Sequence, residues 1–118
     1  MSYEDFTRAA SLRLGITREI TLERMRQHNK FGLQQHPDGT GGETFANMAK
    51  VLKDVVAEAA ANGTLTWQLI LMEEIYEALA ETDPAKLGTE LVQVAAVCVA
   101  WVEDLRTRPV QEAGAGDR

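Results

Sequence analysis

The chain has 118 residues, of which 45% are hydrophobic and 25% are charged, and its formal net charge is −6. This composition predicts one globular domain, and the acidic balance argues against a duplex nucleic-acid surface, which needs clustered positive charge. We expect no apolar run that is both long enough and charge-free enough to span a bilayer, so no membrane partner is expected.

The N-terminus, Met1 to Asp5, has no basic stretch followed by an apolar one, so no secretory signal is expected and a cytoplasmic location is predicted. Cys98 is the only cysteine, and it stands among valine and alanine residues. That setting predicts a buried, inert thiol rather than a nucleophile or half of a disulfide.

Apolar residues recur at helical spacing and strand signals are weak, so the fold class is predicted as all-α, an antiparallel bundle of four to five helices. A first helix is expected over residues 3–14, ended by Gly15. A second is expected from about residue 17 or 21 to about residue 34. Residues 36–42 then concentrate turn formers, which predicts a loop. This loop lacks the Gly-Lys-Ser/Thr ending of a phosphate-binding loop.

A third helix is expected over residues 43–62, with Gly63 as its stop. Thr66 is a good N-cap for a fourth helix, which continues to about residue 81. Asp83 followed by Pro84 then predicts the start of a fifth helix that reaches about residue 105.

The predicted domain covers residues 1–106, and residues 107–118 have few apolar anchors and are expected to form a disordered tail. The helix over residues 84–105 is apolar over most of its circumference, including Val97 and Val102. Four or five short helices cannot cover so wide an apolar surface, so we expect a partner subunit there and predict a homodimer or a homotetramer.

Acidic residues gather on the last two predicted helices. Glu73, Glu74, Glu77 and Glu81 fall within a sector of roughly 100° on one helix. Glu90 lies in the apolar helix that follows, where a carboxylate needs a partner. A purely solvated acidic face is the plainer interpretation of the first group, and that alternative stays open.

The turn between these two helices is very short, which makes them pack antiparallel. Glu74 and Glu77 precede the turn by about the distance at which Glu90 and Gln93 follow it. Three carboxylates and one amide oxygen would then form an oxygen cage for Mg²⁺, a site that Mn²⁺ could also occupy.

These residues carry a resemblance. EEIYE at residues 73–77, twelve intervening residues and ELVQ at residues 90–93 resemble the EExxE…ExxD signature of the MazG-like, all-α nucleoside triphosphate pyrophosphohydrolases. ERMRQHNKFGLQQHPDGTGG at residues 23–42 resembles the RxRQ…KWGxQxHPDG segment of phage and actinobacterial members. TLTWQLILMEE and ELVQVAAVCVAW continue the similarity, which covers about residues 21–103.

The resemblance implies a dimeric helical bundle, or a dimer of dimers, that uses Mg²⁺ to hydrolyse a nucleotide between its α and β phosphates. It also implies metal ligation by Glu74, Glu77 and Glu90, with Glu73 as a supporting acid or as the base that orients water. Gln93 departs from the pattern, because it stands where the family usually has aspartate and brings no negative charge.

The nucleotide itself is less well defined by the sequence. Arg24, Arg26 and Lys30 are candidates for phosphate contacts. Trp67 could stack on a base, although an aromatic residue at helical spacing is more often part of the core. The alternative function is a non-catalytic, nucleotide-binding or regulatory helical dimer with a degenerate metal site, and Gln93 is its best support.

Overall fold

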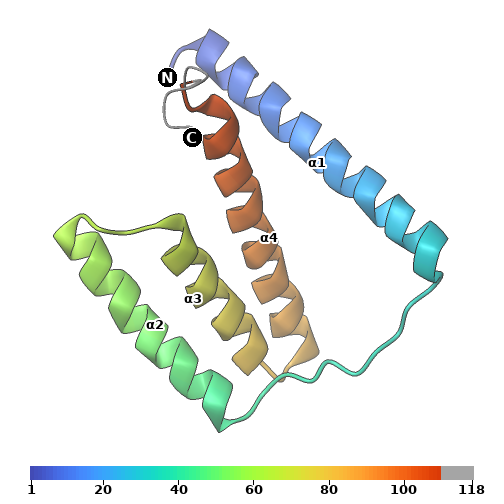
Figure 1. Ribbon diagram of the computed structural model, residues 1–118, viewed down its shortest axis with the longest axis vertical. Helices are drawn as coiled ribbons and strands as arrows, with labels where there is room; N and C mark the ends of the chain where they lie inside the picture. The colour runs from blue at the N-terminus through green and yellow to red at the C-terminus, as the bar shows by residue number, and fades with distance from the viewer. Residues whose placement is uncertain (110–118) are drawn as a thin grey trace, which may run out of the picture.

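The computed structural model describes residues 1–109, and all regular structure in that part of the chain is α-helical. Its helices are α1 (Tyr3–Phe31), α2 (Glu43–Asn62), α3 (Trp67–Ala80) and α4 (Pro84–Thr107) (Figure 1). The predicted all-α class is therefore confirmed. Residue 107 still belongs to α4, and the rest of the predicted tail falls outside the described residues from residue 110 onward.

Helix α1 differs from the sequence prediction, because it continues through Gly15 instead of breaking there. A glycine inside a helix costs about 1 kcal/mol relative to alanine, which a helix of 29 residues can tolerate. The next residue, Ile16, is buried with 3% of its surface exposed, and this burial helps to keep the helix intact. The helix ends at Phe31 rather than near residue 34, since Gly32 adopts a positive φ of 71°.

The other three helices begin and end where local chemistry predicts. Helix α2 covers residues 43–62 and is followed by Gly63 in the left-handed conformation. The Thr66 side chain accepts a hydrogen bond from Leu69 N at 3.2 Å and caps α3. The Asp83 side chain accepts one from Lys86 N at 3.0 Å, and Pro84 opens α4. These caps satisfy backbone N–H groups that a helix start leaves free.

Packing between the helices is uneven. Helix α2 lies along α3 and α3 along α4, whereas α1 contacts α4 but neither α2 nor α3 in the described part of the chain (Figure 1). Within residues 1–109 the buried apolar side chains are small in number: Ile16, Leu52, Ala59, Ala78 and Leu87. The described part of the chain therefore encloses a small core.

The connection from α1 to α2 is anchored to the turn between α3 and α4. Gly41 N donates a hydrogen bond to Leu79 O at 2.7 Å. Gly41 has a φ of 96°, and a Cβ at this position would lie 2.5 Å from Thr82 Cγ2. Both facts require glycine here. The predicted loop thus ends beside the turn that joins the two acidic helices.

Helix α4 corrects two expectations. Its length and apolar composition would by themselves allow it to cross a membrane, contrary to the sequence prediction, although core helices of soluble proteins pass the same test. Cys98 on this helix is exposed rather than buried. Within residues 1–109, α3 and α1 are the only helices that lie against α4, and they leave part of its circumference uncovered.

Candidate metal centre

The α3–α4 hairpin brings three carboxylates together. Glu74 and Glu77 lie three residues apart on one face of α3, and Glu90 lies on α4 after the short turn. One ligand oxygen from each of these residues can be chosen so that all three atoms lie within 4.8 Å of one another. The chain reversal at residues 81–83 thus places two sequence-distant acidic motifs at one point.

Two oxygens of this cluster have unmet bonding capacity. The three side chains are half-buried, but Glu74 Oε2 and Glu90 Oε2 are buried and have no hydrogen-bond partner. An unpartnered, buried carboxylate oxygen destabilises the fold, and crowded carboxylates repel one another. A cation bound between them would coordinate the unpartnered oxygens and reduce the repulsion between the carboxylates. An all-oxygen ligand set of this kind fits Mg²⁺, Mn²⁺ or Ca²⁺ better than zinc.

Burial and neighbouring negative charges raise the pKa values of two carboxyl groups at this site. The pKa of Glu74 is raised above its ordinary value, mainly by burial and then by the negative charges of Glu77, Glu73 and Glu90. Burial and Glu77 also raise the pKa of Glu73, while the nearby Lys53 ammonium acts in the opposite direction. Both carboxyl groups therefore keep their protons to a higher pH than an ordinary glutamate when no cation is bound.

The raised pKa of Glu74 predicts a pH-dependent stability in metal-free buffer. Folding stability should fall as pH rises from about the ordinary value of 4.5 through the raised pKa, because the folded state binds more protons in that window. Urea denaturation in EDTA at a series of pH values from 4.5 upward measures this slope. Glu74→Gln should remove part of it.

Three other acidic groups have lowered pKa values, so their titration does not overlap with this pH window. The pKa values of Glu19, Glu23 and Asp104 are lowered by hydrogen bonds to their partners, so their stabilising contributions are lost only as pH falls below the ordinary range. Their titration therefore lies on the acid side of the window that reports on Glu74. If the wild type and Glu74→Gln differed by a constant amount across the window, the carboxylate explanation would be wrong.

The other residues of the predicted acidic face and oxygen cage lie outside the three-carboxylate cluster. Glu81 lies in the turn, where one carboxylate oxygen accepts hydrogen bonds from the backbone N–H groups of Thr82 and Asp83, each at 3.0 Å. Its structural role is thus to hold the reversal between the helices. Glu73 lies beside the three-carboxylate cluster, and Gln93 is exposed on α4 one turn after Glu90.

The predicted phosphate-binding residues lie on α1, away from the carboxylates. Arg24 donates a hydrogen bond to Gln27 at 2.6 Å, and Arg26 is paired with Glu23. The Lys30 ammonium lies over the Phe31 ring, 5.2 Å from its centroid. Because α1 does not contact α3 in the described residues, the fold of the single chain does not bring these three cations to the acidic cluster.

Trp67 packs against α4 at the end of the α3–α4 hairpin that lies away from the turn. Its Nε1–H donates a hydrogen bond to Asp104 at 2.7 Å, and its ring stacks on Trp101 with centroids 6.4 Å apart. It precedes Glu74 by seven residues, or about 10 Å of helix. The structure therefore does not bring Trp67 to the carboxylates either.

Lys53 on α2 is not among the site residues predicted from the sequence. Its charge opposes the raised pKa of Glu73, so it lies close enough to act as a neighbouring cation. The buried position Leu52 fixes the face of α2 that meets α3, and residue 53 adjoins that face. This placement depends on how α2 is rotated against α3, which the apolar pattern alone fixes only approximately.

Comparisons with known proteins identified no relative of this chain. Searches of protein-family models, of curated proteins and of solved structures found no match to this chain. The geometry of the carboxylates and the sequence motifs are therefore the features that indicate a function.

Proposed function

We propose that this protein is a Mg²⁺-dependent nucleotide pyrophosphohydrolase, which cleaves a nucleoside triphosphate between its α and β phosphates to give a monophosphate and pyrophosphate. The observation that carries the proposal is the convergence of Glu74, Glu77 and Glu90 with two buried, unpartnered oxygens. The motifs at residues 73–77, 90–93 and 23–42 support the same reaction class, because they resemble those of MazG-like enzymes. The corresponding fold would be a MazG-like antiparallel bundle.

Each acidic residue has a distinct part in this proposal. Glu74, Glu77 and Glu90 hold Mg²⁺, which supplies charge neutralisation at phosphoryl oxygens and activation of a water molecule. Glu73 lies next to this set, and its raised pKa makes its carboxylate a stronger base toward water than an ordinary glutamate. Arg24, Arg26 and Lys30 would contact the phosphates only through a change in the position of α1 or from another chain.

A panel of ribonucleoside and deoxyribonucleoside triphosphates tests the reaction. With Mg²⁺ present, we expect at least one nucleotide to give its monophosphate and pyrophosphate in equal amounts, separated by ion-exchange chromatography. Release of orthophosphate and a nucleoside diphosphate would instead indicate cleavage at the γ phosphate. Neither product from any nucleotide, with Mg²⁺ or Mn²⁺, would favour the alternative of a non-catalytic nucleotide-binding or regulatory protein.

Gln93 offers a direct test of metal affinity. An aspartate there would add an ionised oxygen near the cluster, so Gln93→Asp should lower the Mg²⁺ concentration needed for half-maximal turnover by a few-fold. Gln93 is exposed, and the new carboxylate would therefore not be buried without a partner. An Mg²⁺ dependence identical to that of the wild type would place residue 93 outside the metal ligands. Glu58→Asp, at an exposed position on α2, is the control for a general change in acidic side chains.

A further inference from the structure

Lys53 lies near the middle of α2, the helix that packs along α3 (Figure 1). A turn at residues 63–66 joins the two helices and makes them antiparallel. Lys53 precedes the end of α2 by nine residues and Glu73 follows the start of α3 by six, so their heights differ by less than one helical turn. Further from the turn, the rings of Phe45 and Tyr76 lie with their centroids 6.3 Å apart. Lys53 and Glu73 therefore lie between two points where these helices meet.

Lys53 projects from the edge of α2 that adjoins α3. Leu52 is 5% exposed and faces α3, which is the helix that α2 contacts in the described residues. The next residue lies about 100° further around the helix, so Lys53 stands beside this contact and is exposed. Its positive charge lowers the pKa of Glu73, against the effect of burial. The Lys53 edge of α2 is therefore the edge nearest the acidic residues of α3.

The acidic residues of α3 form a band between α2 and α4. Around the helix axis their order is Glu73, Glu77 and Glu74, within a sector of about 100°. Lys53 acts on the pKa of Glu73 at one side of this acidic band, and Glu90 of α4 acts on the pKa of Glu74 at the other side. The acidic band and Lys53 thus form one surface over three helices, with a basic side chain at its α2 edge.

The Lys53 ammonium is free to bind an anion. Within residues 1–109 it forms no ion pair, whereas Arg13, Arg26 and Arg106 are each paired with a glutamate. Exposed lysines are usually just solvated, but this one borders a candidate cation site that an anionic substrate must approach. A single divalent cation leaves part of the charge of the acidic band uncancelled, so a phosphate chain would still be repelled there. A positive side chain at the edge of the band reduces this repulsion.

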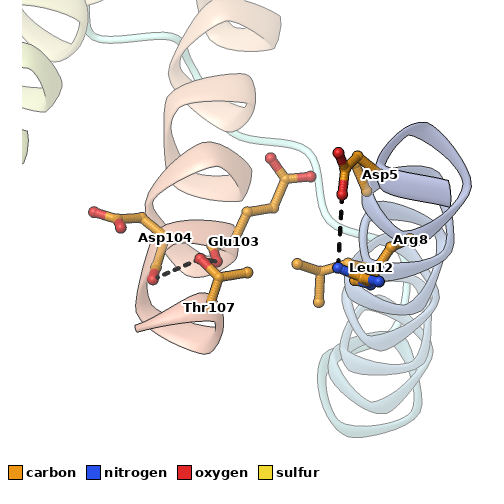
Figure 2. Close-up of a pocket in the computed structure, with 7 residues that line it drawn as sticks. Asp5, Arg8, Leu12, Glu103, Asp104 and Thr107 are labelled. Atoms are coloured by element: carbon orange, nitrogen blue, oxygen red, sulfur yellow. Dashed lines mark hydrogen bonds and ion pairs between the residues drawn. The ribbon is translucent and has the colours of Figure 1, made fainter. Parts of the chain in front are cut away.

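The basic residues of α1 have no such position. Arg13 donates hydrogen bonds to Glu103 at 2.8 and 3.2 Å and holds α1 against the C-terminal part of α4. Figure 2 shows the Glu103 carboxylate extending toward α1 at this end, beside a small cavity between the two helices. Glu103 follows Glu90 by 13 residues, or about 20 Å of helix. The fold thus brings Lys53, rather than a residue of α1, to the acidic band.

We propose that Lys53 binds the pyrophosphate part of the nucleotide, while Glu74, Glu77 and Glu90 hold the cation that binds the same phosphate chain. This inference rests on the proposed function and gives it a phosphate-binding residue from α2. In the proposed reaction a water oxygen bonds to the α phosphorus and loses a proton to Glu73, and the bond from that phosphorus to the bridging oxygen breaks. The bridging oxygen keeps the electron pair, so the departing pyrophosphate gains a negative charge. An ammonium group at this point stabilises both the bound chain and the departing pyrophosphate.

Isothermal titration calorimetry with inorganic pyrophosphate in Mg²⁺ buffer tests the contact without turnover. We expect Lys53→Gln to weaken the binding of pyrophosphate about tenfold or more, because a charge-assisted hydrogen bond is lost. Lys53→Arg keeps the charge and should bind within about fivefold of the wild type. Lys50→Gln is the matched control, since Lys50 is an exposed lysine one turn earlier on α2 and is not among the charges that shift the pKa of Glu73 or Glu74. It should bind pyrophosphate as the wild type does.

Two further measurements on the same variants separate a phosphate contact from a structural role. With a nucleotide that the wild type cleaves, Lys53→Gln should lower kcat/KM about tenfold or more, and it should not weaken the binding of Mg²⁺ alone. Residues 50 and 53 are exposed, so circular dichroism should show wild-type helical content in all three variants. Weaker binding of Mg²⁺ alone in Lys53→Gln would mean that the change disturbs the carboxylates, and the inference would then be wrong.

The pyrophosphate titration also distinguishes this inference from the proposed function. Wild-type cleavage of a nucleotide combined with unchanged pyrophosphate affinity in Lys53→Gln, or with an equal loss of affinity in Lys50→Gln, would overturn the inference and leave the proposed function in place. A wild type that binds pyrophosphate through Lys53 but cleaves no nucleotide would support the phosphate contact and contradict the proposed reaction. A wild type that binds no pyrophosphate in Mg²⁺ buffer would overturn the inference outright.

Discussion

Glu74→Gln should reduce Mg²⁺-dependent release of pyrophosphate at least about a hundredfold and, without divalent cations, should stabilise the fold. The amide removes a negative charge from the proposed metal site, and the loss of a metal ligand is expected to exceed the 10- to 100-fold loss typical of outer-shell partners. In the metal-free protein the same change relieves repulsion with Glu77, Glu73 and Glu90, at a few tenths of a kcal/mol for each neighbouring charge. Activity assays and urea denaturation in EDTA measure the two effects.

Glu58→Gln is the control for this substitution, because Glu58 is an exposed carboxylate on α2 outside the cluster. It should change neither activity nor metal-free stability appreciably. Glu77→Gln and Glu90→Gln should behave like Glu74→Gln. Wild-type activity in two of the three cluster variants would rule out the metal-site assignment, and a large loss of metal-free stability in all three would show that the carboxylates serve the fold.

Leu52→Ala should lower the free energy of unfolding by about 2–4 kcal/mol, whereas Val51→Ala should lower it by less than about 0.5 kcal/mol. These neighbours differ in burial, since Leu52 is 5% exposed and Val51 is 53% exposed on the same helix. Leu52 belongs to the small set of buried side chains, so its loss removes a large share of the described core. A larger cost at Val51 than at Leu52 would mean that α2 meets α3 through a different face.

Features set by local chemistry were predictable from the sequence. Thr66 and the Asp83-Pro84 pair mark helix starts because their side chains or ring suit the first turn, and the structure has α3 and α4 begin there. The juxtaposition of Glu74 with Glu90 also follows from a local fact, the short turn between their helices. Gly15 was misleading, because a modest intrinsic penalty does not decide whether a long helix breaks.

Features set by long-range packing were not predictable. The segment from residue 32 to residue 42 has no helix or strand, so it does not fix the direction of α1 relative to α3. For that reason the sequence could not show that Arg24 and Arg26 lie away from the carboxylates. Helix α4 is apolar on both sides, and only contacts such as Trp67 with Asp104 and Arg13 with Glu103 reveal which side meets α3.

Thermal melting with and without a divalent cation tests most directly whether Glu74, Glu77 and Glu90 form a cation site. At a pH where these groups are ionised, Mg²⁺ or Mn²⁺ should raise the melting temperature of the wild type in a saturable way, because a ligand bound only to the folded state stabilises it. Glu74→Gln should lose most of that increase, while Glu58→Gln should retain it. An increase of the same size in wild type and Glu74→Gln, or none in the wild type with either cation, would contradict the proposed metal centre.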